Sequence, residues 1–236
     1  ASIWWQPLQQ TIRNMQPHHQ TFASKLIHNR IPCFAEKFSV SPTSQCPCCN
    51  SQKETIEHFH KCTTNLASTL SVITQLRELQ HKHMRNPNLI ILLTQTLQGK
   101  PNTIESLLKE SPNTNWKVYN DLITSQKAIG WNEIHRLMFT KEWSIHQIRY
   151  EQFCRSKTAH NLTWMAKIIR IIFNRKYNRW NQRNATAHPK QDNKATKEFL
   201  LSRIRQFYTY KDGIKEGDRH AFEKPIEDWE ESTIYQ

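Results

Sequence analysis

The sequence predicts an all-α fold, a helical bundle with a small Cys3His zinc-knuckle insert. Apolar residues recur at helical spacing along most of the 236 residues, whereas period-2 runs and Asn-Gly or Asp-Gly hairpin turns are missing from the sequence. Four of the six cysteines also fall within seventeen residues, 46–62, together with two histidines. The 8 Trp and 10 Phe residues supply large side chains for a packed core.

In the first half of the chain, helices are predicted where apolar spacing lies between Pro or Gly residues. They cover residues 8–15, 19–30, 66–84, 88–98 and 103–109. The stretch 31–45 holds Pro32 and Pro42, and we expect it to be irregular. The polar segment 111–115 is predicted to be a domain boundary.

In the second half, a long helix over 163–186 is the strongest prediction, and His188-Pro189 is expected to end it. Other helices are expected at 117–129, 131–139, 141–156 and 193–210, with Gly130 as a break. The predicted organisation has three parts: N-terminal helices plus knuckle at 1–68, connecting helices at 69–115, and a basic helical bundle with an acidic tail at 116–236.

The charge of the chain is strongly positive and unevenly distributed. There are 33 Lys and Arg against 20 Asp and Glu, a net charge of +13. Residues 159–212 carry +9 of it, and residues 213–236 carry −4. Concentrated positive charge favours contact with the phosphate backbone of RNA or DNA. The alternative is a solvated helix face that only keeps the protein soluble.

The predicted long helix changes character along its length. Apolar residues Trp164, Ile168, Ile171 and Ile172 share one face, and basic residues occupy the same angular sector after Asn174. The predicted nucleic-acid-binding residues are Arg170, Arg175, Lys176, Arg179 and Arg183. Tyr177 and Trp180 lie beside this sector; they either stack on bases or pack inward, and inward packing is favoured.

Composition also excludes several classes of protein. The 4 Gly residues are not clustered, which excludes Gly-rich nucleotide cradles of the Rossmann or P-loop kind. No apolar run approaches the roughly 20 residues of a membrane span, so no membrane partner is expected. We expect an intracellular protein, nuclear or cytoplasmic. Because the chain begins at Ala1 rather than Met, we expect a fragment or a processed product.

The cysteine cluster predicts a structural Zn²⁺ site with ligands Cys46, Cys49, His58 and Cys62. Two thiolates at x2 spacing clasp one side of a metal, and Asn50 after them tolerates the positive φ of a knuckle turn. His58 and Cys62 are four residues apart, so a short helix presents both on one side. Three thiolates and an imidazole favour zinc and leave no open position for catalysis.

The ligand set leaves alternatives open at the sequence level. Cys48 could replace Cys49 or Cys46, and His60 could replace His58. A disulfide framework or free thiols would dispense with the metal, although one dense cluster without a signal peptide disfavours disulfides. If the site binds zinc, chelation is predicted to unfold the insert locally, because the insert has almost no apolar core.

Part of the sequence resembles the zinc-binding segment near the C-terminus of non-LTR retrotransposon reverse transcriptases. The resemblance covers roughly residues 4–65, and its motifs are His28-Asn-Arg-Ile-Pro32, Cys46-Pro-x-Cys49, Glu54-Thr55, His58 and Cys62. Ala128-Ile-Gly-Trp131, Phe139-x3-Trp143 and Trp180-x2-Arg183-Asn184 look like the helical tail of retroelement-derived proteins of algal type. The resemblance implies a non-catalytic accessory region that grips RNA or DNA. Polymerase and endonuclease motifs are missing from the sequence, so it implies a C-terminal piece or a domesticated remnant.

A second, shorter resemblance suggests an enzyme. Arg183-Asn184-x3-His188 resembles the R-N-x3-H motif of HEPN ribonucleases, which are all-α and metal-independent. That resemblance implies that Arg183 binds the scissile phosphate, His188 acts as general acid or base, and Asn184 orients one of them. Chance and helix-end preferences also explain these residues. A third class, a protein-interaction scaffold whose basic face meets an acidic partner, stays open.

Overall fold

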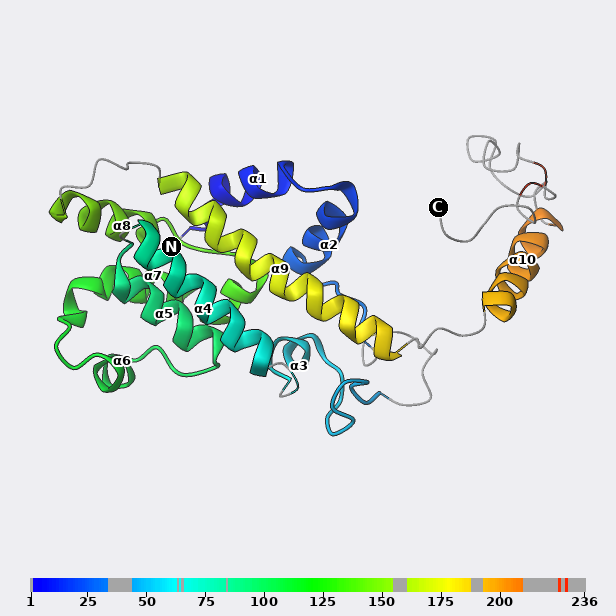
Figure 1. The fold of residues 1–236 in the computed structure, drawn as a ribbon, viewed down its shortest axis with the longest axis horizontal. Helices are drawn as coiled ribbons and strands as arrows, with labels where there is room; N and C mark the ends of the chain where they lie inside the picture. Colours follow the sequence, from blue (N-terminus) through cyan, green and yellow to red (C-terminus); the bar gives the residue numbers. More distant parts are fainter. Residues whose placement is uncertain are drawn as a thin grey trace. The chain divides into compact units, whose positions relative to one another are not determined.

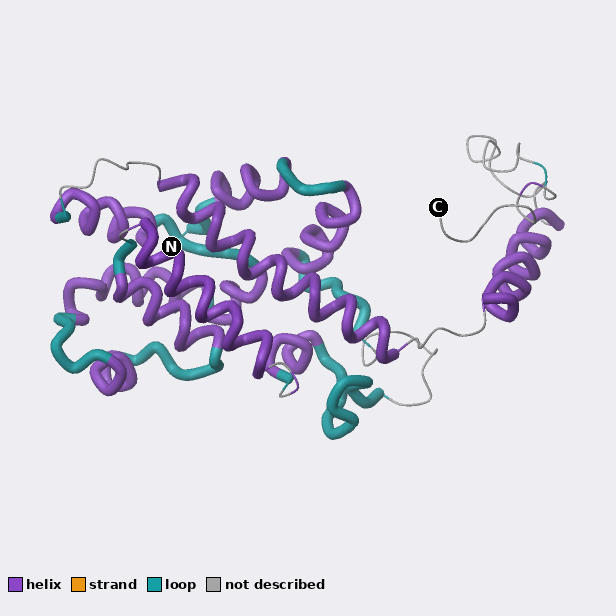
Figure 2. Tube along the Cα trace, viewed as in Figure 1, coloured by secondary structure: helices purple, strands orange, loops and turns teal. Residues whose placement is uncertain are grey.

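The computed structural model describes residues 2–33, 44–62, 64, 66–83, 85–154, 161–187, 193–209, 225 and 228. Over these residues the protein is all-α, as predicted, and the tube in Figure 2 shows helices joined by loops. Extended pairing in this part of the chain is limited to two isolated antiparallel bridges, Ile3–Thr140 and Gln45–Lys53. The predicted fold class is therefore confirmed.

The helices follow one another with short connections, and 3-10 turns are labelled η. The first half of the chain contains α1 (Trp5–Arg13), α2 (Pro17–Ile27), α3 (Ile56–Lys61), α4 (Leu66–His83), α5 (Pro87–Leu97) and α6 (Ile104–Glu110). The second half contains η2 (Trp116–Tyr119), α7 (Asn120–Ile129), η3 (Trp131–Arg136), α8 (Glu142–Phe153), α9 (Asn161–Ala187) and α10 (Asn193–Thr209).

The chain divides into two compact units, 1–183 and 184–236, rather than at the predicted boundary of 111–115. The reason lies in how the segment 111–115 is held. Trp116 is buried, and its indole N–H donates to the carbonyl of Ser111 over 3.3 Å. The Thr114 hydroxyl donates to the side chain of Asn88 at the start of α5 over 3.2 Å. A polar sequence is thus part of the packed first unit.

The first unit is organised around α9, which runs along it in Figure 1 with α1 and α2 on one side and α4 on the other. One continuous core of buried apolar side chains extends from Leu8 to Phe173. The first half of α9 contributes Trp164, Ile168 and Ile172 to this core, all fully buried. The apolar helix α5 is buried along most of its length, because core residues surround it on several sides.

The predicted helix over 131–139 is shorter and tighter than expected. Gly130 ends α7 with φ +103°, a conformation that favours glycine, and η3 ends at Arg136 before Leu137 with φ +68°. The buried Gln126 amide donates to the Gly130 carbonyl and accepts from the Trp143 indole at 2.9 Å. The same side chain accepts the backbone N–H of Thr140 over 3.3 Å, so Gln126 bonds backbone groups that lie outside a regular helix here.

Among the described residues, each helix is too short or too polar to cross a membrane. This agrees with the apolar runs of the sequence.

Candidate metal centre

A knuckle turn brings the first two cysteines together. The backbone N–H of Asn50 donates to the carbonyl of Cys46 over 2.8 Å, and Asn50 has the positive φ, +52°, that the sequence predicted. The N–H of Cys46 donates to the carbonyl of Gln52 over 2.8 Å, which closes the loop beside the Gln45–Lys53 bridge. Local hydrogen bonds therefore hold the Cys46 and Cys49 side chains on one side of the turn.

The short helix α3 supplies the other two candidate ligands. Thr55 caps it, because its hydroxyl oxygen accepts the backbone N–H of His58 over 3.0 Å. His58 lies in the first turn and Cys62 at the C-cap, so one helical turn separates them along the axis. Phe59 of α3 is buried in the core and fixes this helix against the rest of the first unit.

The four ligand atoms converge on one point. They all lie within 4.8 Å of one another, and two pairs are in contact: Cys46 Sγ and Cys62 Sγ at 3.9 Å, and Cys49 Sγ and His58 Nε2 at 3.4 Å. His58 Nδ1 is 2.7 Å from Gln52 Oε1, so the ring N–H donates there and the Nε2 lone pair faces the sulfur atoms. The group could hold a metal ion with four protein ligands.

The structure places the alternative ligands elsewhere. His60 is on a different side of α3, where its Nδ1 lies 3.1 Å from Lys176 Nζ and its ring stacks on His135. Cys48 is half-buried beside the cluster but does not belong to the converging group. The set predicted from the spacing, Cys46, Cys49, His58 and Cys62, is the one that comes together.

The thiols of the cluster differ in acidity in the metal-free chain. Burial raises the pKa of Cys46 to about 12. Burial also acts to raise the pKa of Cys49, but hydrogen bonds from the side chain and backbone of Ser51 outweigh it and lower that pKa to about 6. Cys49 therefore loses its proton more readily than Cys46. A bound cation would hold both sulfur atoms as thiolates.

The predicted basic sector of α9 is buried, which corrects the expectation of an exposed nucleic-acid-binding surface. Of the five predicted residues, only Arg170 is partly exposed. The exposed fractions of the others are Arg175 5 %, Lys176 1 %, Arg179 4 % and Arg183 1 %. These four continue the face that carries Ile168 and Ile172, and the knuckle, α3 and the start of α4 contact them. The sequence signal for this burial was that the four cations share one angular sector of the helix with the isoleucines.

Arg183 has a specific buried partner. Its Nε and Nη2 donate to the two carboxylate oxygens of Glu54 over 2.7 and 2.6 Å, and both side chains are 1 % exposed. This forked pair connects the knuckle to α9. It engages two nitrogens of the side chain that the ribonuclease interpretation assigns to the scissile phosphate. His188 lies outside the described residues, and Asn184 belongs to the second unit.

Arg179 approaches the metal site itself. Burial lowers its pKa, whereas the neighbouring Cys62, through charge and hydrogen bonding, and then Cys48 and Cys46 act to raise it. The guanidinium carbon also lies 4.8 Å from the centre of the Phe59 ring. Arg179 is therefore a buried cation beside a cluster of sulfur atoms, where a metal–thiolate centre of net negative charge would be neutralised.

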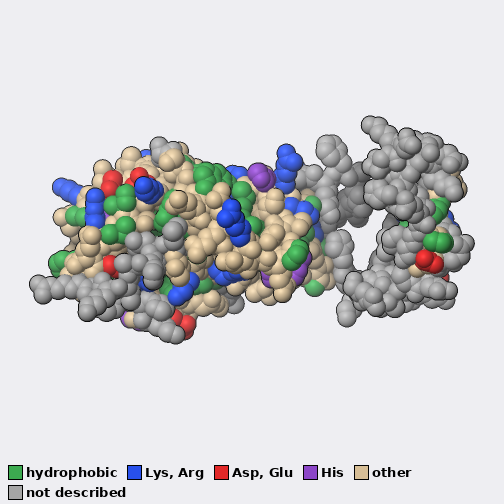
Figure 3. All heavy atoms as spheres, turned by 90° about the horizontal axis from the view of Figure 1, so that it is seen from above, with side chains coloured by type: hydrophobic (Ala, Val, Ile, Leu, Met, Phe, Trp, Pro, Cys, Tyr) green, Lys and Arg blue, Asp and Glu red, His purple; other side chains and the backbone are tan. Residues whose placement is uncertain are grey.

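A different basic surface lies over α1, α2 and α9, and of its cations the sequence predicted only Arg170. These three helices contain no Asp or Glu, and they present cations to solvent. We call their exposed side the acid-free face; its cations are Arg13, Lys25, Lys167 and Arg170. Figure 3 shows Lys, Arg and His side chains spread over the visible surface of the first unit, with a few Asp and Glu side chains among them. The sequence signal was the absence of acidic residues from both 1–33 and 161–187.

Two shallow hollows lie on the acid-free face. One lies between α1 and α9 and is lined by Lys167 and Arg170, and the other lies on α1 and is lined by Arg13. Both share Gln10 and Asn14, and Arg170 Nη2 donates to the Asn14 carbonyl over 3.2 Å.

The two aromatic residues in the second half of α9 pack inward. Tyr177 packs edge-on against His19 at 4.4 Å, and Trp180 stacks on Phe22. The expected inward packing of Tyr177 and Trp180 is thus observed.

Comparison with known proteins adds no relative. No protein-family model, curated protein or solved structure matches this chain.

Proposed function

We propose that this protein is a zinc-stabilised, non-catalytic helical module that binds the phosphate backbone of RNA or DNA through its acid-free face. The observation that carries the proposal is the absence of Asp and Glu from α1, α2 and α9, on a chain of net charge +13. A phosphate backbone meets no carboxylate on this face, so attraction is not offset by local repulsion. Such a role belongs in the nucleus or cytoplasm.

Zinc is the metal that the donor set fits best. With Zn–S near 2.3 Å and Zn–N near 2.0 Å, tetrahedral geometry requires S···S contacts of roughly 3.8 Å and S···N contacts of roughly 3.5 Å. Two of the six pairs of ligand atoms are at 3.9 and 3.4 Å, and all six lie within 4.8 Å. All four positions would be filled by protein, so the ion would stabilise the knuckle and leave no place for a substrate.

Metal analysis of reduced, freshly purified protein tests the zinc assignment. We expect one zinc per chain, retained in Cys48→Ser and lost in Cys49→Ser. The two variants make the same change to neighbouring residues, so Cys48→Ser controls for the loss of a thiol in the knuckle. Protein without zinc, or equal loss in both variants, would contradict the ligand set.

The acid-free face has chemistry suited to a nucleic-acid backbone. Arg13, Lys167 and Arg170 supply charge, and the shared Gln10 and Asn14 can hydrogen-bond to phosphate and sugar oxygens. Shallow hollows of this kind would bind the charged backbone of a strand without contacting the edges of its bases. We therefore propose binding without base specificity, and no catalytic step is part of the proposal.

Oligonucleotide binding at increasing salt concentration tests this proposal. Affinity of the zinc-loaded protein for a single-stranded RNA or DNA is expected to fall steeply from 50 to 200 mM salt, because bound phosphates release counterions. A peptide nucleic acid of the same base sequence lacks phosphates, and we expect it not to bind. Affinity that is absent or insensitive to salt would favour the protein-interaction scaffold instead.

The resemblance to retrotransposon reverse transcriptases supports an origin as the accessory region of such a polymerase. Its unusual Glu54-Thr55 step has structural reasons in this protein: Glu54 holds Arg183, and Thr55 caps α3. The ribonuclease alternative is opposed by the same pair, since Arg183 is engaged by a buried carboxylate.

A further inference from the structure

Two histidines follow one another at the start of α2, on the acid-free face. The ring centres of His18 and His19 are 4.2 Å apart. His18 is exposed and His19 is half-buried. Histidine is the side chain that ordinarily gains or loses its charge between pH 5 and pH 8. The charge of this part of the surface therefore depends on pH.

Ring contacts with α9 hold the pair in place. The ring of His19 packs edge-on against Tyr177 at 4.4 Å and against the buried Phe173 at 5.6 Å. The ring of His18 lies 6.0 Å from the same Tyr177 ring. Among the described residues, neither histidine has a hydrogen-bond partner for its ring nitrogens, and neither contributes a buried unpartnered nitrogen. The ring nitrogens are therefore open to solvent and free to contact a ligand.

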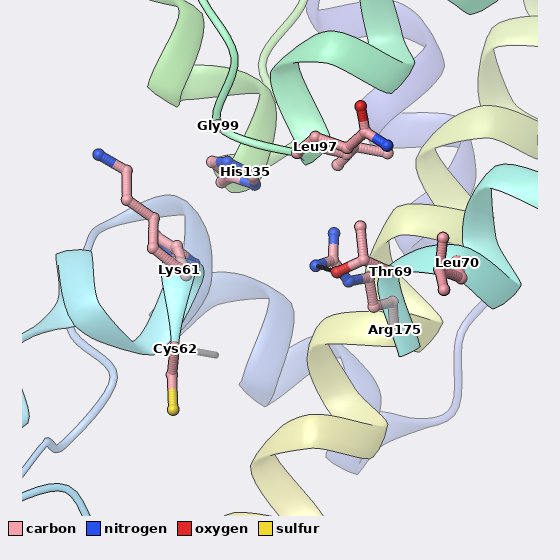
Figure 4. A pocket seen from close by; sticks show the side chains of 10 residues that line it. Lys61, Cys62, Thr69, Leu70, Leu97, Gly99, His135 and Arg175 are labelled. Carbon is pink, nitrogen blue, oxygen red and sulfur yellow. Dashed lines mark hydrogen bonds between the residues drawn. The ribbon is translucent and has the colours of Figure 1, made fainter. Parts of the chain in front are cut away.

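Arg170 is the cation of α9 that acts on this pair. It lies toward α1, where its Nη2 donates to the carbonyl of Asn14 over 3.2 Å, and it lines the hollow between α1 and α9. Figure 4 shows that Arg175 lies on a different side of the same helix, against Thr69 at the start of α4. A phosphate held by Arg170 in the hollow would therefore act on the charge of His19, as Arg170 itself does.

The other charged groups around the pair are positive. On α1 the one titratable side chain is Arg13, and on α2 it is Lys25 besides the histidines. On the side of α9 that faces the pair, the titratable groups are Arg170 and the phenol of Tyr177. Within the described part of the chain, the helices packed against the pair thus offer it no carboxylate.

These surroundings disfavour the charged form of His19 in the free protein. Burial, and then the charges of His18 and Arg170, lower the pKa of His19. A phosphodiester beside the ring acts in the opposite direction, because its negative charge favours the protonated imidazole. A ligand that raises the pKa of a group binds the protonated form more tightly. The gain in affinity begins as the pH falls through the pKa of the bound state and is complete below the pKa of the free state.

We propose that His18 and His19 make binding of a nucleic-acid backbone to the acid-free face dependent on pH, tighter in mild acid than at pH 8. The inference rests on the binding role proposed for that face. A protonated imidazole adds charge beside Arg170 and has two N–H donors, which suit the acceptor oxygens of phosphodiesters. At pH 8, where histidine is ordinarily neutral, the Lys and Arg residues of the face bind alone.

Oligonucleotide affinity measured at pH 8 and pH 6 tests the proposal. The zinc-loaded protein is titrated with a thymidine oligonucleotide at constant ionic strength, with its zinc content verified at each pH. Neither thymine nor the phosphodiester changes its charge in this range. We expect the affinity to rise at least about threefold from pH 8 to pH 6. Binding that does not change with pH would overturn this inference alone, whereas absence of binding at both pH values would overturn the proposed function as well.

Histidine variants locate the effect. The double variant His18→Gln, His19→Gln keeps polar side chains that do not titrate, so its affinity should stay near the wild type at pH 8 and should not rise at pH 6. His81→Gln removes an exposed histidine from α4 and should keep the full rise. A rise retained by the double variant, or lost in His81→Gln, would contradict the proposal.

A measurement on the unmodified protein covers the case in which replacement of the half-buried His19 disturbs folding. In NMR titrations of the histidine rings, the oligonucleotide should raise the pKa of His19, because the bound phosphates favour its charged form. The ring signals of His81 should follow the same titration curve with and without the oligonucleotide. An unchanged titration of His19 in the saturated complex, or an equal change at His81, would overturn the proposal.

Discussion

At the scale of single residues, the most informative feature is where the cations of α9 lie. Four of them point inward, and each meets a different environment. Arg183 has a carboxylate, Arg179 has thiols and an aromatic ring, Arg175 has a threonine, and Lys176 has a histidine. Burying cations in this way is unfavourable unless each has a compensating partner. The knuckle supplies two of these partners, Glu54 for Arg183 and the cysteine cluster for Arg179.

The Glu54–Arg183 pair is predicted to be a strong contributor to stability once formed. Glu54→Gln leaves a buried guanidinium without its counter-charge, and we expect a loss of about 3–5 kcal/mol in the free energy of unfolding. Glu57→Gln breaks the exposed pair with Lys61 and should cost far less, because solvent screens that pair. Denaturant unfolding of both variants gives the comparison. Similarly small losses of stability in the two variants would show that the buried pair does not stabilise the knuckle.

His135 is predicted to make the protein less stable in mild acid. Burial, and then the charges of Lys176 and Arg175, hold its pKa well below 6.5, so it is neutral in the folded state. The unfolded chain takes up a proton below pH 6.5 and the folded chain does not. Its stabilising effect is therefore complete above that pH and is lost as the pH falls toward the folded-state pKa.

The variant His135→Phe keeps a ring at this position and removes the titrating group. Between pH 8 and pH 6 it should lose less stability than the wild type. His60 and the metal ligands are present in both proteins, so the difference between the two is assigned to position 135. Chemical unfolding at the two pH values measures it, and identical pH dependence would contradict a neutral buried His135.

At the scale of elements, the sequence predicted what is local and missed what is tertiary. The knuckle was predictable because the spacing Cys46-x2-Cys49 and the turn at Asn50 depend on neighbouring residues alone. Helix positions followed from apolar spacing within a few residues. The face on which Arg175 and Arg183 lie was also predictable, but not what covers it, because α3 comes from more than a hundred residues away.

The same distinction explains two further differences. Segment 111–115 reads as a linker by composition, yet the Trp116 indole and the Thr114 hydroxyl tie it to the first unit. The buried Gln126 side chain bonds backbone groups outside a regular helix near Gly130, which a propensity argument does not detect. In a sequence, polar side chains that make hydrogen bonds within the folded protein cannot be told from those of exposed loops.

Removal of the metal is predicted to loosen one set of elements and spare the rest. With a chelator, hydrogen–deuterium exchange should accelerate over residues 44–62 and in α9 around Arg179, because the knuckle then has little apolar core to replace the metal. Helices α5, α7 and α8 pack on buried aromatic residues away from the site and should stay protected. Acceleration across all helices, or none at the knuckle, would contradict a local stabilising role.

At the scale of the whole molecule, the charge of the chain separates into an interior part and a surface part. The interior cations join the knuckle to α9, and the surface cations lie on helices without acidic residues. Net charge alone therefore overstated how much of residues 159–212 is available to a partner. Nucleic-acid binding is therefore proposed for the surface part only.

Oligonucleotide binding by two triple variants of equal charge tests the central claim most directly. Arg13→Gln, Lys167→Gln and Arg170→Gln together neutralise the acid-free face, whereas Lys109→Gln, Lys117→Gln and Lys127→Gln neutralise exposed lysines on α6, η2 and α7. We predict that the first variant loses affinity at least about tenfold and has a salt dependence lower by about two units of slope, whereas the second stays near the wild type. Equal losses in the two variants, or a larger loss in the second, would contradict the account.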